Sequence, residues 1–445
     1  MAGKGATDIK RVETAAEKAV IGHFDSMPGD DPMHDVRASA FDVIRHSGLP
    51  NRRVEDWKYT DLRTLLHDVP APAGPGDVEK ARAILAESDP LADLAGSRIV
   101  FVNGQFVPSL SDMAAIADQV DFASLGRFLA DGGAIFDRFD MVDPSETPIM
   151  ALNSAFMSDG AVLNIKQDAD VEKPIHLAHL FVGEEAGLQT LRNLVSVESG
   201  AKATIFETYH GPDGLAYHTN TVSQIHIAEQ AEVRWIKLVE DGSAAVHLGL
   251  SASRLDANAV FDPFTYTAGP ALTRNEMRMV FSGRNTKSGI RGATLVRDDG
   301  HADFTLLVDH AVPDCESREY FKSVIDDTAR AVFQGKIIVR PDAQHTVGQM
   351  MSQALLLDEG GEFDNKPELE IFADDVICAH GATCGQIDEE MLFFLRSRGI
   401  GEAEAEQLLV QAFLAEAIEE MGDEAVEQVL EARTRKWLGM APEVE

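Results

Sequence analysis

Two cysteines and a histidine lie close together in the last fifth of the 445-residue chain. Cys378, His380 and Cys384 fall within seven positions. Thiolate and imidazole groups both suit iron as ligands. If this segment is a β-strand, Cys378 and His380 point to the same face, because alternate residues of a strand do so. The pair can then offer two ligands to one metal ion.

The same residues also have structural interpretations. Cys378 can be a small buried apolar residue, and Gly381-Ala382 can simply turn the chain. The chain has only one other cysteine, Cys315, and no CxxC pair. A stable cluster or a structural zinc ion usually takes about four paired Cys or His ligands, so any metal role is shared or transient. Three cysteines are also too few for a disulfide framework and favour reduced thiols.

Other chemical motifs are weaker or absent. His176 and His179 would point to opposite faces of a strand and could not chelate one ion. The order of residues in Gly283–Gly289 does not fit the phosphate-binding loop GxxxxGK[ST]. The sequence also has no GxSxG, HExxH or GxGxxG motif. Ordinary ATPase, hydrolase and dehydrogenase functions therefore lose their usual support.

The charge and hydropathy of the chain exclude two classes of partner. Lys and Arg total 39 against 74 Asp and Glu, a formal net charge of −35. Such a chain repels phosphate backbones, so we expect no nucleic-acid binding. The first ten residues lead into a charged segment, and no stretch approaches the ~18 apolar residues of a membrane span. We expect a cytoplasmic protein.

Helical periodicity dominates both ends of the chain, and short β-branched runs dominate its middle. Over residues 1–160 we expect a helical region interrupted by a proline-rich linker and one hairpin with a tight Asn-Gly turn. Over 387–445 we expect two or more amphipathic helices, the first ending before Gly399. Their apolar stripe must pack on the chain's own core or on a partner. The segments concerned are helices at Ile9–Met27, Asp35–His46, Ser145–Met157, Met391–Leu395 and Leu408–Ile418, the linker Val69–Gly76 and the hairpin Arg98–Val107.

Residues 161–386 form the third predicted unit, a β-rich core. A turn of small residues recurs there at intervals of 30, 26, 45, 27 and 14 residues. Approximate repetition of this kind suggests stacked rungs that bury each other's apolar faces. An antiparallel sandwich gives similar spacing, and periodicity alone leaves both open. The turns are Gly200-Ala201, Gln230-Ala231, Asp256-Ala257, His301-Ala302, Thr328-Ala329 and Asp342-Ala343.

Several segments together resemble the SufB/SufD family of iron–sulfur cluster assembly scaffolds. The segment around the candidate ligands carries the signature of the SufD branch, and no SufB-type Cys motif with Glu-His-Glu-Ala is present. Matches elsewhere extend the resemblance over nearly the whole chain. The matching segments are Asn51–Leu62, Pro313–Arg318, Asp327–Gly335, Glu370–Glu390 and Leu395–Ile400.

This resemblance implies a mainly β fold, a right-handed parallel β-helix flanked by helical regions at both ends. It also implies a non-enzymatic scaffold that pairs with SufB through the β-helix. Two copies of the SufC ATPase would dock on the C-terminal helices of the pair. ATP-driven closure of SufC would then strain the SufB interface and expose ligands there. The family's histidine and cysteine map onto His380 and Cys378.

The resemblance also bears on cofactors. It implies no stable cofactor in the isolated chain, but transient iron or a nascent cluster at the shared interface. Cys384, where many relatives lack a thiol, is a further candidate ligand, whereas Cys315 is interpreted as structural. Flavin binding by the complex and homodimer formation by the chain alone stay open. The alternative function is that of a carbohydrate-active β-helix enzyme with an Asp/Glu cluster on its solenoid face.

Overall fold

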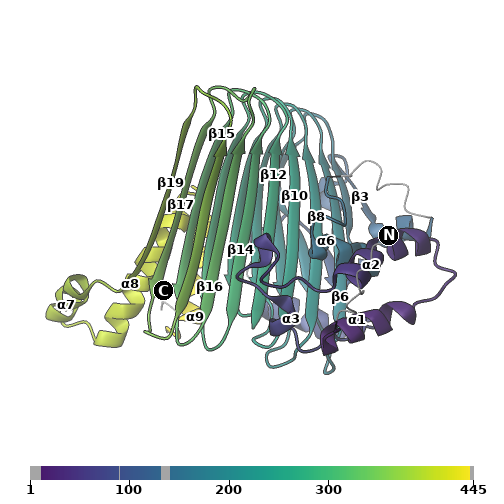
Figure 1. Cartoon of the computed structure of the whole chain (residues 1–445), viewed down its shortest axis with the longest axis horizontal. Helices are drawn as coiled ribbons and strands as arrows, with labels where there is room; N and C mark the ends of the chain where they lie inside the picture. Colours follow the sequence, from purple (N-terminus) through teal and green to yellow (C-terminus); the bar gives the residue numbers. More distant parts are fainter. Residues whose placement is uncertain (1–11, 90, 132–140, 441–445) are drawn as a thin grey trace, which may run out of the picture.

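The centre of the molecule is a parallel β-solenoid. The computed structural model describes residues 12–89, 91–131 and 141–440. From β4 onward, successive strands alternate between two sheets, and the neighbours among these strands run parallel along the solenoid (Figure 1). Only the β1–β2 and β3–β4 pairs are antiparallel among the described residues. Leu188 lies beside His218, and Lys202 beside Glu232, so one turn takes about 30 residues. About eight turns stack between residues 162 and 386. The fold is therefore the one implied by the family resemblance, and the antiparallel sandwich is excluded.

Strands β5 to β19 are nine to eleven residues long, whereas the first four strands are shorter. In spatial order the larger sheet contains β19 (Ile377–Gln386), β17 (Val347–Leu356), β15 (Glu316–Ile325), β13 (Lys287–Val296), β11 (Val260–Ala268), β9 (Glu232–Glu240), β7 (Lys202–His210), β5 (Asp170–Leu180), β1 (Ser97–Val102) and β2 (Gln105–Phe106). The smaller sheet contains β18 (Glu362–Ile371), β16 (Arg330–Val339), β14 (His301–His310), β12 (Leu272–Phe281), β10 (Val246–Leu255), β8 (His218–Ile227), β6 (Leu188–Val197), β4 (Ala161–Ile165) and β3 (Val120–Ser124).

Helices precede and follow the solenoid in the sequence. They are α1 (Ala15–Asp25), α2 (His34–Ser47), α3 (Leu62–Leu65), α4 (Val78–Ser88), α5 (Leu125–Ala130), α6 (Pro148–Phe156), α7 (Glu389–Ser397), α8 (Glu402–Glu419) and α9 (Glu424–Trp437), with short 3-10 turns at Glu55–Trp57, Pro108–Leu110 and Ala114–Ile116. The predicted tight turn is confirmed, because Asn103 and Gly104 both have positive φ between β1 and β2. The helix expected from Ser145 begins later, at Pro148, because Thr147 occupies the N-cap position. The predicted linker is a loop, but it lies against β6, because the Ala73 N–H donates to the Leu188 carbonyl and the Leu188 N–H donates to the Ala71 carbonyl.

The corners of the solenoid explain why the sequence repeat looked irregular. At one corner a residue with positive φ recurs in successive turns, as at Gln230, Asn258 and Asn285. The residue after it is small and buried, because the chain bends sharply around it. This column consists of Ala201, Ala231, Ala259, Thr286, Cys315 and Thr346. The intervals in the sequence were uneven because they mixed two corners and included His301-Ala302, which begins a strand.

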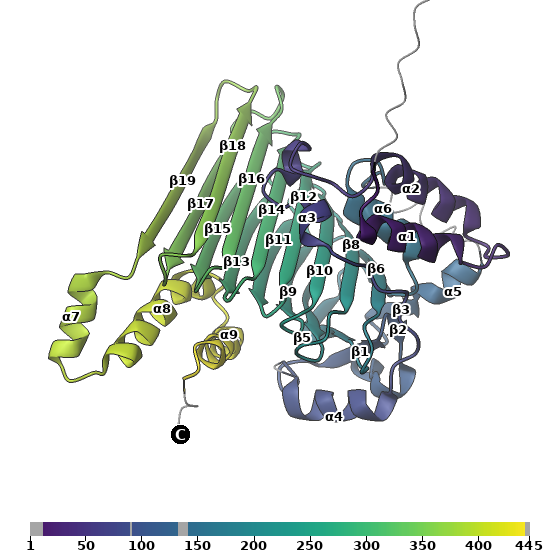
Figure 2. The ribbon, with the colours of Figure 1, turned by 60° about the horizontal axis from the view of Figure 1, so that its bottom comes forward.

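Helices cover part of the outer face of each sheet. Helices α1, α2 and α6 pack on the smaller sheet, where Phe41 and Ile149 join Leu250 of β10 in one apolar cluster (Figure 2). Helices α8 and α9 pack on the larger sheet, where Leu414 joins Phe264 of β11. Part of the C-terminal apolar stripe is thus buried against the chain's own solenoid.

The predicted motif at Asn51–Leu62 attaches the N-terminal region to the smaller sheet. Trp57 is buried, and the Arg274 guanidinium lies 3.9 Å from the centre of its ring. The same guanidinium donates a 2.9 Å hydrogen bond to the Asp56 carbonyl and pairs with the buried carboxylate of Asp303. A buried charge needs such partners, so the motif has a structural role here.

A polar cluster lies inside the solenoid. The Glu207 carboxylate accepts hydrogen bonds from the Tyr209 hydroxyl at 2.7 Å and the Trp235 indole at 2.9 Å. The Lys237 charge is the main factor that lowers its pKa against the opposing effect of burial. The charge is therefore held by specific partners instead of by water.

Replacing Glu207 by alanine should lower the free energy of unfolding by about 3–5 kcal/mol. The change removes a charge partner of the buried Lys237 and the hydrogen-bond acceptor of Tyr209 and Trp235. Chemical denaturation of the full chain measures this. The matched control is Glu232→Ala on β9. It removes the exposed ion-pair partner of Lys202 on β7 and should lower stability far less. Equal losses in the two variants would contradict the structural importance of the buried cluster.

Candidate metal-ligating end of the solenoid

The candidate ligands lie on β19, the last strand of the larger sheet. This strand pairs with β17 on one side, and its other edge has no strand partner among the described residues. The outer edge of β18 in the other sheet is likewise unpaired there. We call this last turn, formed by β18 and β19, the open end (Figure 2).

Cys378, His380 and Cys384 all belong to one face of β19. Their neighbours on β17 are Gly348, Met350 and Ala354, which are buried and face the solenoid interior. In an earlier turn such side chains would be covered by the next turn. Here Cys378 is half-buried against the core, whereas His380 and Cys384 are exposed. The open end therefore presents two thiols and an imidazole that continue the interior face.

The opposite end of the solenoid is closed. The β1–β2 hairpin, β3 and the loop between them contribute Phe101, Ile116 and Val120 to the main interior cluster. These side chains occupy the position that a further turn would fill. The two ends of the solenoid thus differ, because apolar side chains cap one end, whereas no strand covers Cys378, His380 and Cys384 at the other within the described residues.

The thiols at the open end favour their protonated form. Burial raises the pKa of Cys378, and the charge of Glu319 raises it further, although a backbone hydrogen bond from Gly348 acts in the opposite direction. Burial also raises the pKa of Cys384. Metal ligation requires the thiolate. An incoming cation must therefore displace a proton at either cysteine.

The open end is not a preassembled metal site. Among the described residues, one group of three Cys, His, Asp or Glu side chains has donor atoms that all lie within 4.8 Å of one another, and it consists of Asp326, Asp327 and Asp358. Cys378 and His380 are not part of such a group. Their geometry agrees with a site that needs further ligands from elsewhere.

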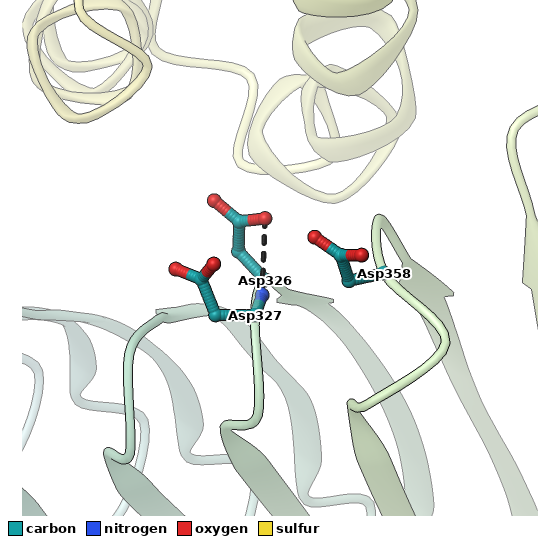
Figure 3. A group of neighbouring side chains, drawn as sticks. All are labelled: Asp326, Asp327 and Asp358. Carbon is teal, nitrogen blue, oxygen red and sulfur yellow. Dashed lines mark hydrogen bonds between the residues drawn. The ribbon is translucent and has the colours of Figure 1, made fainter.

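The three aspartates lie at a solenoid corner after β15 and β17 (Figure 3). Burial raises the pKa of Asp326, and the neighbouring charge of Asp327 raises it further. The backbone N–H of Asp327 donates a 3.1 Å hydrogen bond to the Asp326 carboxylate. Exposed carboxylates often gather in this way without an ion, so we assign this group no role.

The other histidines and the third cysteine discussed in the sequence analysis are buried and make contacts within the fold. His176 and His179 are buried on opposite faces of β5, as predicted. His176 hydrogen-bonds Thr208 at 2.8 Å, and His179 stacks between aromatic rings. Cys315 is buried in the small-residue corner column, with its thiol 3.3 Å from the Gly283 carbonyl. The structure agrees with a structural interpretation of Cys315.

Two further features were not anticipated in the sequence. None of the residues of α7 is buried, although Met391, Phe393 and Phe394 are large and apolar. This helix projects beyond the open end (Figures 1 and 2). Glu319 on β15 is buried, and neither of its carboxylate oxygens has a hydrogen-bond partner of good geometry. Burial raises its pKa, although an interaction with the Ser317 side chain acts in the opposite direction. The alternation of Ser317, Glu319 and Phe321 could have indicated that this carboxylate faces inward.

Sequence comparisons place these features in a known group of proteins. The profile described as "SUF system FeS cluster assembly, SufBD core domain" matches residues 180–413, and "SufBD protein N-terminal region" matches residues 27–177. In the part of the chain that the structure describes, no helix has the length and apolarity of a membrane span.

Individual relatives agree with both profiles. The iron–sulfur cluster assembly protein SufD of Escherichia coli is 31% identical over 88% of this chain and 89% of its own length. An iron–sulfur cluster assembly SufBD family protein of Synechocystis is 29% identical over 93% and 92% of the two chains. SufD of Bacillus subtilis is 25% identical over 65% and 67%. The match, the solenoid and its helical flanks together show that this chain belongs to the SufB/SufD family and has that family's role in iron–sulfur cluster assembly.

Proposed function

We propose that this chain is the SufD-type scaffold subunit of a SufB–SufC–SufD complex. It pairs with a SufB subunit through the open end of its solenoid and contributes His380, with Cys378, to a transient iron or nascent cluster site between the two. The observation that carries this proposal is the position of the candidate ligands on the last strand, where an incoming subunit would enclose them. Cys384 is available on the same face as an additional thiol.

The open end has the character of a protein interface. Two strand edges there expose unpaired backbone groups, which favour pairing with another chain. Ile371, Phe372 and Ile377 are 41%, 60% and 64% exposed around the same end. Exposed apolar side chains beside free edges favour a docking surface over a solvated end. A second β-solenoid offers matching edges, as a SufB subunit would.

The SufC ATPase docks, in this proposal, on α7. Helices α8 and α9 already bury part of their apolar residues on the solenoid, whereas no residue of α7 is buried. We therefore expect SufC to dock on α7, the first of the C-terminal helices, and not on all of them. ATP hydrolysis, in this proposal, belongs to SufC.

The proposal is tested by co-expressing the chain with candidate SufB and SufC subunits, followed by size-exclusion chromatography and iron analysis. A ternary complex that accumulates iron and sulfide is the expected result. Polysaccharide cleavage by the chain, without a complex, would favour the carbohydrate-active alternative. The family match gives that alternative no support.

Replacing Ile377 by aspartate should weaken association with SufB at least tenfold, because it places a charge at the docked edge. Exposed Ile377 makes little contribution to the fold, so the thermal unfolding of the free chain should hardly change. Quantitative pull-down measures the association. Val54→Asp, at an exposed apolar residue of the N-terminal region, is the control. Unchanged SufB binding by Ile377→Asp would place the interface elsewhere.

A further inference from the structure

The Lys237 ammonium group reaches from the larger sheet across the solenoid interior to the smaller sheet. Lys237 lies on β9 and is 9% exposed. A Cβ atom at Gly249 of β10 would lie only 2.8 Å from Lys237 Nζ, so the ammonium group occupies space that glycine leaves there. Among the described residues, Lys237 makes no direct hydrogen bond and no ion pair within 4.0 Å. A buried charge of this kind needs a polar partner.

A small cavity adjoins this ammonium group. It has a volume of about 20 Å³, and its polar lining comes from Glu207, Lys237 and Thr265 of the larger sheet and Ser251 and Asn275 of the smaller sheet. A cavity of this kind holds one water molecule once it exceeds about 10–15 Å³. Empty cavities in proteins have apolar walls, whereas a carboxylate, an ammonium group and an amide line this one. Its size and lining therefore fit one small polar molecule.

Hydrogen-bonding atoms around the cavity have complementary roles. The Asn275 side-chain nitrogen donates a 3.2 Å hydrogen bond to the Thr267 hydroxyl, whereas its oxygen is buried without a partner. This oxygen lies 3.2 Å from the same Cβ position at Gly249 and thus close to the ammonium group. The Glu207 carboxylate is a second acceptor, because each carboxylate oxygen can accept more than one hydrogen bond. One donor and two acceptors therefore surround the cavity.

We propose that this cavity binds one water molecule, which accepts a hydrogen bond from Lys237 and donates hydrogen bonds to Asn275 and Glu207. Water offers two donor hydrogens and an acceptor lone pair within the available volume. Glu207 would repel an anion, and Lys237 would repel a metal ion. Buried waters typically make about three such bonds and are costly to remove.

The bound water joins the two sheets in the middle of the solenoid. Glu207 and Lys237 lie side by side on β7 and β9, and Asn275 lies on β12 of the other sheet. The Glu207 and Lys237 charges are thus paired through the water without direct contact. The site lies away from the open end and does not depend on the proposed function.

A crystal structure of the full chain, at a resolution that shows ordered solvent, tests the proposal directly. One density peak within hydrogen-bonding distance of Lys237 Nζ, Asn275 Oδ1 and the Glu207 carboxylate is the expected result. A cavity without density, or a direct ion pair between Lys237 and Glu207, would overturn the proposal.

Asn275→Leu tests the same site in solution, because it replaces the unpartnered acceptor with an apolar side chain. Water oxygen-17 relaxation dispersion detects long-lived internal water in the full chain. The variant should lose the contribution of one such water, and its unfolding temperature should fall because Lys237 loses a partner. An unchanged contribution in Asn275→Leu would contradict the site, whatever the unfolding temperature.

The matched control is Asn365→Leu on β18. Both amide atoms of Asn365 are also buried without hydrogen bonds, but this residue does not line the cavity. Asn365→Leu should keep the full contribution of internal water and should not lower the unfolding temperature. Equal loss of internal water in both variants would show that the measured water lies elsewhere and would likewise overturn the proposal.

Discussion

Replacing His380 by alanine should reduce cluster formation on the assembled complex at least tenfold and leave subunit association intact. The side chain is exposed on β19, so its removal creates no cavity in the solenoid. Its loss takes one imidazole from a site that has few protein ligands. Anaerobic reconstitution with iron and sulfide, followed by absorption spectroscopy and metal analysis, measures the yield.

The design includes a matched histidine and a double variant. His46→Ala removes an exposed histidine of α2, far along the chain from the open end, and should form clusters normally. If Cys378 and His380 bind the same ion, Cys378→Ser combined with His380→Ala should lose little more than either change alone. Additive losses would indicate two separate sites. A full cluster yield in His380→Ala would show that His380 is not a ligand of the cluster site.

The second large effect is expected at α7. Replacing Phe393 and Phe394 by aspartate should abolish co-purification with SufC, because buried aromatic anchors commonly contribute about 2–4 kcal/mol each to an interface. These two side chains are 72% and 55% exposed in the free chain. Their substitution should therefore leave the thermal unfolding of the chain nearly unchanged. Isothermal titration with purified SufC gives the affinity directly.

A control variant tests whether any added surface charge weakens SufC binding. Val36→Asp introduces aspartate at a 49% exposed position of α2 and should bind SufC like the wild type. Truncation from Leu408 is a poorer test, because it also removes Val410 and Leu414, which pack on the solenoid. Retained SufC binding by the α7 double variant would show that docking uses another surface.

Local sequence patterns predicted much of the fold. The Asn103-Gly104 turn was correctly predicted because positive φ at two consecutive residues depends on local chemistry. Helix α2 and the end of α7 before Gly399 followed from apolar spacing and a positive-φ glycine. Periodicity did not separate solenoid from sandwich, since both bury alternate residues of short strands. Parallel pairing joins residues about 30 positions apart and needed the family resemblance.

The candidate site was only partly accessible from the sequence. The shared face of Cys378 and His380 followed from strand alternation, and the register with Gly348 and Met350 agrees with it. The exposure of that face depends on which turn is last, which no local pattern states. Glu319 was missed because its neighbours across the sheet, Ile290 of β13 and Met350 of β17, are 29 and 31 positions away in the sequence. The difference in exposure between α7 and α8 likewise depends on packing against the solenoid, which local sequence patterns do not state.

We expect the open end to become a cluster site only when a partner subunit encloses it. The most direct measurement is the iron and sulfide content of the purified chain, alone and as the complex with SufB and SufC, after the same anaerobic reconstitution. We expect clusters in the complex and substoichiometric iron in the lone chain. A stable, stoichiometric cluster on the lone chain would contradict it.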